Sequence, residues 1–276
     1  MELRLGDGRT VQVWDGGSRV AGAPVVVFFH GCPDTRWAAM TGHQAAVRAG
    51  VRLVCANRPG YGASTAAATT HTSVADDALA VADLLGAGEL AVLGMSVGGP
   101  YALATAARAP GRVRAAAVVA APGDLPEQRQ PGSAEEVVER SRPEYAAWCA
   151  QVLADDADSP DDAALAGRFL AGLPGPDAAL LAAYGDAWVA ASLREALAQP
   201  EGFLRDAAVT FGVWDFAVED VTCPTSLWCG AADTNAPPEN GDALAARLPD
   251  AHLHLGATTH LATLLTRWDE VLEHLR

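Results

Sequence analysis

The sequence predicts an α/β fold, in which a mostly parallel, twisted sheet carries helices on both faces and a helical cap is inserted. Short, continuous apolar runs alternate with helical stretches, which is typical of parallel strands covered on both faces. The alternation stops between about Leu125 and Glu219 and then resumes. We therefore expect a core of residues 1–124 and 218–276 and a cap of residues 125–217.

The first part of the chain predicts a hairpin followed by strands and helices in alternation. Leu3–Leu5 and Thr10–Trp14 flank Gly6-Asp7-Gly8-Arg9, which is a hairpin signal. Apolar runs predict strands at Val25–Phe29, Arg52–Ala56, Leu90–Leu93 and Val113–Ala120. Helical patterns predict helices at Trp37–Ala49, Thr72–Leu85 with Ser73 as its N-cap, and Ser96–Arg108.

The second part predicts helical runs broken by prolines, and then a return to alternation. The resumed alternation consists of strands at Thr225–Cys229 and Ala251–Leu255 and helices at Pro238–Leu248 and Leu261–Leu275. The break begins and ends close to the carboxyl ends of strands, which is where open α/β sheets hold their ligands. The insertion is therefore expected to cover the functional site.

Composition excludes several classes of function. The net charge of −15 argues against a nucleic-acid partner and against an anionic membrane surface. No run of eighteen apolar residues predicts a membrane span, and Met1–Arg4 does not open a secretory signal. The five cysteines form no C-x-x-C pair, so reduced thiols in a cytoplasm are the simplest expectation. A small-molecule substrate and a monomer or homodimer are expected.

The sequence Gly94-Met95-Ser96-Val97-Gly98 lies between an apolar strand and an alanine-rich helix. A serine at such a sharp bend adopts a strained backbone conformation that lifts its hydroxyl clear of the sheet. The small residues on either side keep strand and helix from colliding. The motif predicts Ser96 as a nucleophile, and the alternative is a serine that merely caps the helix.

A serine nucleophile needs a base and an acid that orients the base. The order expected for this geometry is serine, acid, histidine, and each partner should follow a strand. Asp233 and His260 meet both conditions, although Asp233 could instead cap a helix or turn. His30 follows a strand but precedes Ser96, and the remaining histidines fit the role less well: His43, His71, His252, His254 and His274.

These motifs together resemble the α/β-hydrolase family over essentially the full length of the chain. The residues that carry the resemblance are His30-Gly31, Arg58-Pro59-Gly60-Tyr61-Gly62-Ala63-Ser64, the Ser96 motif, Gly230–Asp233 and Thr259-His260-Leu261. The resemblance implies that the backbone amides of Cys32 and Val97 form an oxyanion hole. It also implies that His30 shapes its loop and is not the base.

Two positions depart from the family pattern, and a third narrows the chemistry. Thr259 stands where relatives have a glycine, and Asn57 stands where an acidic residue is common. Relatives that act on epoxides or haloalkanes carry an aspartate at the elbow, whereas Ser96 implies acyl transfer. No metal and no organic cofactor is expected.

The expected function is therefore a serine hydrolase of an ester, lactone or thioester. A proline-iminopeptidase-like aminopeptidase and a carbon–carbon bond hydrolase remain open on the same triad. An aminopeptidase would need an acidic cap pocket, for which the candidates are Glu135, Glu136, Glu139 and Glu144, although such a run is more often a solvated helix face. A non-hydrolytic binding scaffold is the alternative of another class.

Substrate selection should depend on the cap. Five apolar residues could line an apolar pocket, although each such residue is more often part of the core than a substrate contact: Met95, Trp148, Leu173, Trp188 and Trp214. The sequence thus predicts a medium-sized, largely apolar acyl substrate.

Overall fold

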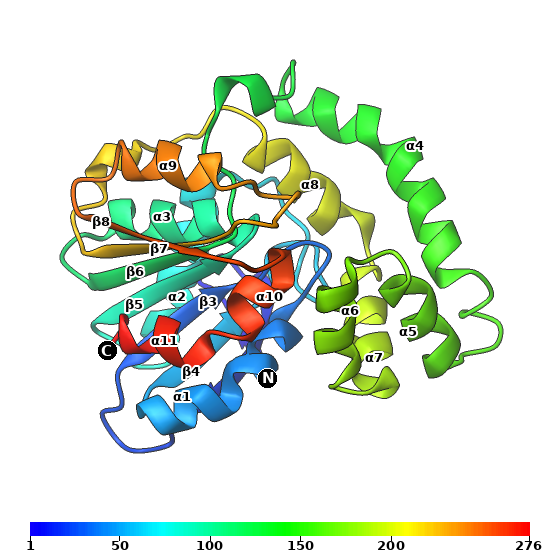
Figure 1. The fold of residues 1–276 in the computed structure, drawn as a ribbon, viewed down its shortest axis with the longest axis horizontal. Helices are drawn as coiled ribbons and strands as arrows, with labels where there is room; N and C mark the ends of the chain where they lie inside the picture. The colour runs from blue at the N-terminus through cyan, green and yellow to red at the C-terminus, as the bar shows by residue number, and fades with distance from the viewer.

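The computed structural model describes residues 1–276 and contains one eight-stranded sheet (Figure 1). The sheet has the strand order β1-β2-β4-β3-β5-β6-β7-β8. Its strands are β1 (Glu2–Arg4), β2 (Thr10–Gly17), β3 (Val25–Phe29), β4 (Arg52–Ala56), β5 (Leu90–Met95), β6 (Val113–Val119), β7 (Thr225–Gly230) and β8 (Ala251–Gly256). The strands from β4 to β8 in this order pair in parallel, whereas β2 pairs antiparallel with both β1 and β4. The predicted fold class is confirmed.

The strand order reverses between β3 and β5. The chain passes from β3 to its neighbour β4 on one side, and then crosses to β5 on the other side of β3. Loops that leave two strands in opposite directions open a crevice at the carboxyl edge of the sheet. The segments that leave β3 and β5 begin at His30 and Ser96, so this crevice brings two of the predicted motifs together.

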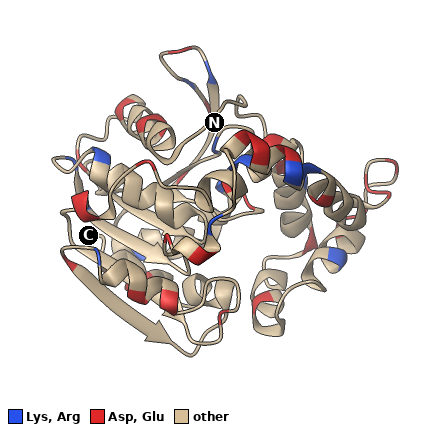
Figure 2. Cartoon of the chain, turned by 90° about the horizontal axis from the view of Figure 1, so that it is seen from above, with Lys and Arg blue, Asp and Glu red and all other residues tan.

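Helices cover both faces of the sheet. One face packs against α2 (His71–Leu84), α3 (Gly98–Arg108) and α9 (Glu239–Ala245), with a cluster of 30 buried apolar residues between the layers. The other face packs against the 3₁₀ helix η1 (Arg36–Gly42), α1 (His43–Ala49), α10 (His260–Leu265) and α11 (Trp268–Glu273). The strands are largely free of charged residues (Figure 2), as burial on both faces requires.

Residues 125–217, called here the helical insertion, contain no strand. Their elements are the 3₁₀ helix η2 (Pro126–Gln128), α4 (Ala134–Leu153), α5 (Asp162–Leu170), α6 (Gly175–Ala182), α7 (Asp186–Ala196) and α8 (Pro200–Thr210). A further 3₁₀ helix, η3 (Val218–Asp220), leads back to β7. The five α-helices gather at one side of the sheet (Figure 1). They enclose a separate apolar cluster of 13 buried residues. No helix of the chain is long and apolar enough to cross a bilayer.

Three predictions of local structure need correction. Thr70, and not Ser73, is the N-cap of α2, because the two side chains form a capping box in which Ser73 occupies the third helical position. The predicted helix Leu261–Leu275 is two helices, α10 and α11, with Thr266 and Arg267 between them. The predicted helix Trp37–Ala49 begins as 3₁₀ and becomes α-helical only at His43.

Candidate active site

Ser96 occupies the bend between β5 and α3. Its φ angle is 54°, in the left-handed region that is costly for a residue with a side chain. A Cβ atom at Gly98 would collide with the carbonyl oxygen of Phe29, and one at Gly94 would collide with that of Gly98. The spacing of the motif is therefore a steric requirement of this turn.

The loop that follows β3 lies directly beside Ser96. A Cβ built on Gly31 would stand 3.5 Å from the Cβ of Ser96, which shows how closely the two segments approach. The backbone N–H groups of Cys32 and Val97 donate to no acceptor in the protein, and both residues line the same cavity as Ser96. Two backbone donors without an acceptor in the protein thus belong to residues that share the cavity of Ser96, and an oxyanion hole needs such donors. Burial raises the pKa of the Cys32 thiol far above its usual range.

Asp233 and His260, which are 27 positions apart, meet at the carboxyl ends of β7 and β8. The Nδ1 of His260 lies 2.8 Å from Oδ2 of Asp233. Oδ1 of Asp233 accepts the backbone N–H groups of Asn235 at 2.9 Å and Ala236 at 3.0 Å. The Asp233 side chain has no exposed surface. A carboxylate held in this way fixes the orientation of the ring and leaves Nε2 free to act as a base.

Ser96 and His260 line one cavity of about 840 Å³. The hydroxyl of Ser96 makes no hydrogen bond to the imidazole or to any other protein group in this structure. Hydrogen bonds between a nucleophile and its base often become short only when substrate is bound. The structure thus brings the three predicted side chains to the same edge of the sheet, with one of the two contacts formed.

The cavity lies between the core and the helical insertion, and 19 of its 31 lining residues are hydrophobic. Of the five residues predicted to line it, four do so: Met95, Trp148, Leu173 and Trp188. Trp214 does not, and this prediction is wrong. Its indole is buried in the core, donates to the carbonyl of Thr210 at 3.0 Å and stacks on Phe216.

A buried ion pair holds the loop that carries Cys32. The guanidinium of Arg58 donates to the carbonyls of His30 at 2.7 Å and Gly31 at 3.0 Å. Its Nε and Nη2 also donate to the carboxylate of Asp206 in α8. The hydroxyls of Tyr61 and Tyr101 also donate to Asp206, at 2.6 and 2.9 Å. The helical insertion therefore supports the loop through a fully buried network.

His30 is part of this loop and not of the acid–base machinery. It is buried, and its Nδ1 lies 2.9 Å from the carbonyl of Gly31. Burial, together with the charge of Arg58, lowers the pKa of His30 well below its usual value. A neutral, enclosed imidazole suits a structural role.

A second acid of the insertion, Asp177 in α6, supports the helix that begins with His260. Its Oδ1 accepts the hydroxyl of Thr259 at 2.5 Å and the backbone N–H of Ala262 at 2.9 Å. Ala262 is the third residue of α10, so Asp177 satisfies a helix N–H that an N-cap would normally bind. This contact gives Thr259, the departure from the family pattern, a structural role.

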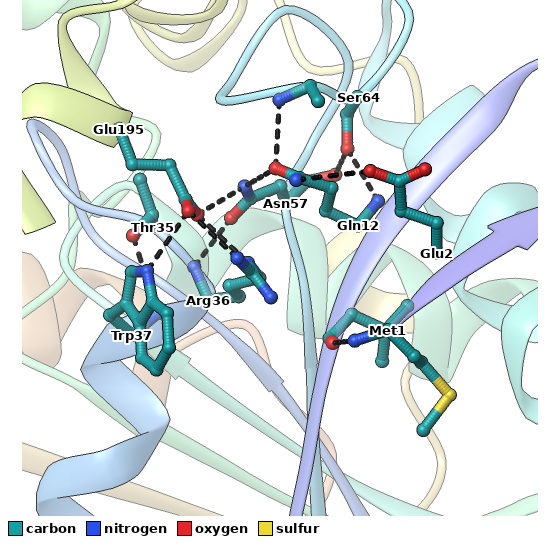
Figure 3. A network of polar contacts seen from close by, with 11 residues as sticks. Met1, Glu2, Gln12, Thr35, Arg36, Trp37, Asn57, Ser64 and Glu195 are labelled. Carbon is teal, nitrogen blue, oxygen red and sulfur yellow. Dashed lines mark hydrogen bonds and ion pairs between the residues drawn. The ribbon is translucent and has the colours of Figure 1, made fainter.

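A third acid, Glu195 in α7, binds the core at the start of η1 (Figure 3). Arg36 donates to both of its oxygens at 2.9 Å, and the indole N–H of Trp37 donates at 3.0 Å. The Nδ2 of Asn57 donates to Glu195 at 2.8 Å, while its Oδ1 accepts the backbone N–H of Arg36. An acidic residue at position 57 would face Glu195, so asparagine is the complementary choice there.

Sequence reasoning missed these three acids of the insertion, because their partners in the core are distant in the sequence. Its candidates for an acidic cap pocket were four glutamates of α4, for which it favoured a solvated helix face, and none of them lines the cavity: Glu135, Glu136, Glu139 and Glu144. Of these, Glu135 pairs with Arg205 on the surface and Glu136 forms a capping box with Ser133. The pocket that an aminopeptidase would need is absent from α4.

Comparisons with known proteins agree with this fold. A family model described as alpha/beta hydrolase fold matches residues 24–265. An enol-lactonase from Burkholderia xenovorans LB400 is 19% identical, with a TM-score of 0.72 over 99% of this chain and 97% of that one. A thermophilic esterase from Thermogutta terrifontis is 20% identical, with a TM-score of 0.70 over 99% and 96% of the two chains.

An alpha/beta hydrolase fold protein from Nakamurella multipartita is 25% identical, with a TM-score of 0.67 over 99% of both chains. No curated protein sequence matches the chain. The match to the family model spans most of the sequence, and it includes the elbow at Ser96 as well as Asp233 and His260. The chain therefore belongs to the alpha/beta hydrolase fold family.

Proposed function

We propose that the protein is a serine hydrolase that cleaves an ester-type bond (ester, lactone or thioester) through an acyl-enzyme. The observation that carries the proposal is the shared cavity. It holds the Ser96 hydroxyl, the His260 imidazole oriented by Asp233, and the free amides of Cys32 and Val97. A nucleophile, an oriented base and two donors for an oxyanion are the parts that acyl transfer needs.

In the proposed reaction, Ser96 Oγ attacks the substrate carbonyl while Nε2 of His260 takes the hydroxyl proton. The carbonyl π electrons move to oxygen, which the amides of Cys32 and Val97 stabilise. The leaving alcohol or thiol departs with the proton from the imidazolium, whose charge Asp233 stabilises. Water then attacks the acyl group by the same steps, with His260 again as base. The free acid is released, and the Ser96 hydroxyl is regenerated with the proton from His260.

The character of the cavity supports a medium-sized, largely apolar acyl substrate. Its size and mainly hydrophobic lining suit such a group. The esterase and the enol-lactonase among the similar structures are also consistent with ester-type chemistry. A lactonase or an aminopeptidase could use the same triad, so a panel of p-nitrophenyl esters, lactones and aminoacyl anilides should be assayed in parallel.

Labelling with a fluorophosphonate probe tests the proposal, because such a probe reacts with an activated serine. We expect the wild-type protein to be labelled and Ser96→Ala to be unlabelled. Ser192→Ala is a matched control, since Ser192 lines the same cavity but lies outside the triad, and it should be labelled. An unlabelled wild type, or labelling that survives Ser96→Ala, would favour a non-hydrolytic scaffold.

A further inference from the structure

The cavity beside Ser96 contains one carboxylate, Asp34, which has no part in the proposed triad. Asp34 lies in the loop that follows β3, two positions after Cys32. Two residues span at most about 7 Å along the chain. Asp34 therefore stands close to the amide that is proposed to bind the carbonyl oxygen of the substrate.

The protein itself leaves this carboxylate largely without partners. Oδ1 accepts the backbone N–H of its neighbour Thr35 at 2.8 Å, and no arginine or histidine pairs with Asp34. Oδ2 makes no hydrogen bond of normal geometry in the protein, although the Ser192 hydroxyl is near enough to lower the pKa of the carboxyl, and Asp34 is partly exposed. Since Asp34 lines the cavity, this free oxygen is open to whatever the cavity holds.

The other carboxylates at the junction of core and insertion are fully engaged. Asp206 binds Arg58 and two tyrosine hydroxyls, and Glu195 binds Arg36 together with two further donors. Asp177 accepts a hydroxyl and a backbone N–H. Asp34 is half-buried and has fewer protein donors than any of these three acids, so it has the capacity to accept a further donor from a ligand in the cavity.

The ionisation of Asp34 reflects the missing partner. Burial raises its pKa to about 7, against the opposing effects of the Thr35 amide, Arg58 and Ser192. A donor supplied by a ligand would relieve this strain by stabilising the carboxylate. Perturbed groups of this kind concentrate at binding and catalytic sites.

We propose that Asp34 is a specificity-determining residue, which accepts a hydrogen bond from a hydroxyl or ammonium group on the acyl part of the substrate. The donor sits on the second or third carbon of the acyl chain, because Asp34 stands so close to the oxyanion hole. The rest of the acyl group fills the apolar part of the cavity. This inference rests on the proposed function and adds one polar contact to a substrate that is otherwise apolar.

Matched p-nitrophenyl esters test the inference. One set compares 3-methylbutanoyl, 3-hydroxybutanoyl and 3-aminobutanoyl esters. A second set carries the methyl, hydroxyl or amino group on the second carbon of the butanoyl chain instead. We expect wild-type kcat/KM, corrected for uncatalysed hydrolysis, to favour at least one donor-bearing ester over its methyl counterpart by about tenfold or more. No preference for a donor at either position would overturn the inference.

Variants of Asp34 test whether the preference for donor-bearing esters comes from this side chain, and whether it depends on the acceptor oxygen or on the negative charge. Asp34→Leu removes the acceptor and should reduce the ratio of donor ester to methyl ester to about one. Asp34→Asn keeps an acceptor but no charge, so it should retain a preference for the hydroxyl ester and lose one for the ammonium ester. Using ratios within each variant cancels any general loss of activity. An unchanged ratio in Asp34→Leu would contradict the inference.

Gln151→Leu provides the matched control, because Gln151 is a polar residue of α4 that lines the same cavity. Its ratios should equal those of the wild type, and a loss as large as that in Asp34→Leu would count against a specific role for Asp34. A wild type that hydrolyses no ester and binds no fluorophosphonate refutes the proposed function. A labelled, active wild type without a donor preference refutes only the role of Asp34.

Discussion

The core and the helical insertion are each held together mainly by apolar packing of their own, whereas polar contacts orient them where they meet. Two buried residues near the end of the insertion, Val209 and Trp214, do belong to a core cluster. The core has two apolar clusters, one on each face of the sheet, and the insertion has its own. Across the junction, three carboxylates of the insertion bind core segments that carry the site: Asp177 binds the start of α10, Glu195 binds the start of η1, and Asp206 binds Arg58.

This difference separates two physical tasks. Apolar packing is not directional, so it stabilises each layer without fixing their relative placement to a fraction of an ångström. Hydrogen bonds and ion pairs depend on distance and angle, so they can fix it. The insertion therefore orients the loop and the helix to which the proposed catalytic groups belong, in addition to lining the cavity.

The largest effect should come from the core. Replacing Ser96 or His260 by alanine removes the nucleophile or the base, so each should lower kcat/KM for a p-nitrophenyl ester by at least about a thousandfold. Far-UV circular dichroism and thermal unfolding should resemble those of the wild type. Activity within tenfold of wild type in either variant would contradict the assignment of that residue.

The next largest effect should come from Asp206 in the insertion. Asp206→Ala leaves the buried Arg58 and two tyrosine hydroxyls without their acceptor, so it should lower the free energy of unfolding by about 3–5 kcal/mol. Urea unfolding measures the loss. Tyr61→Phe removes only one donor and should cost about 1 kcal/mol. Equal losses in the two variants would show that the carboxylate is not the centre of the network.

A smaller effect should come from Asp177, which tests whether the insertion positions His260. Asp177→Ala removes the acceptor for Thr259 and Ala262, and we expect about 1–2 kcal/mol of lost stability together with about a tenfold loss in kcat. Asp177→Asn keeps an acceptor oxygen and should recover most of the activity. Asp186→Ala, which changes an exposed acid of the same insertion, is the control and should leave kcat unaltered. Unaltered kcat in Asp177→Ala would contradict this role.

A pH-dependent effect should come from Asp34. Because the pKa of Asp34 is raised to about 7 in the folded protein, the folded state holds a proton that the unfolded state releases above about pH 4. Asp34 therefore reduces stability increasingly as the pH rises from 4 to 7. Asp34→Asn should raise the Tm more at pH 8 than at pH 5, as differential scanning fluorimetry can measure. A larger gain at pH 5 would contradict the sign.

Much of the fold could be predicted from the sequence, because buried parallel strands appear as continuous apolar runs. Val25–Phe29 and Thr225–Gly230 are examples in which every residue is buried. Ser96 could be found because the turn that exposes it requires small neighbours, which produces a short local motif. Asp233 and His260 could be found because both follow strands whose carboxyl ends share one edge.

The contacts across the junction could not be predicted, because no local pattern encodes them. Asp206 lies 148 positions from Arg58, and Glu195 lies 159 positions from Arg36. In the sequence each acid appears as an ordinary polar residue of a helix. Trp214 was misplaced for a related reason: it lies near the end of the insertion, and apolar character alone does not show whether a side chain faces the cavity or the core.

The most direct test of the account is to trap the acyl-enzyme. The protein should be mixed with p-nitrophenyl butyrate, quenched with acid within the first turnovers, digested and analysed by mass spectrometry. The account predicts a butyryl group on the peptide that contains Ser96, at the serine itself, and none in Ser96→Ala. A butyryl group on another residue that is turned over at the catalytic rate, or turnover with no acyl-enzyme at all, would contradict it.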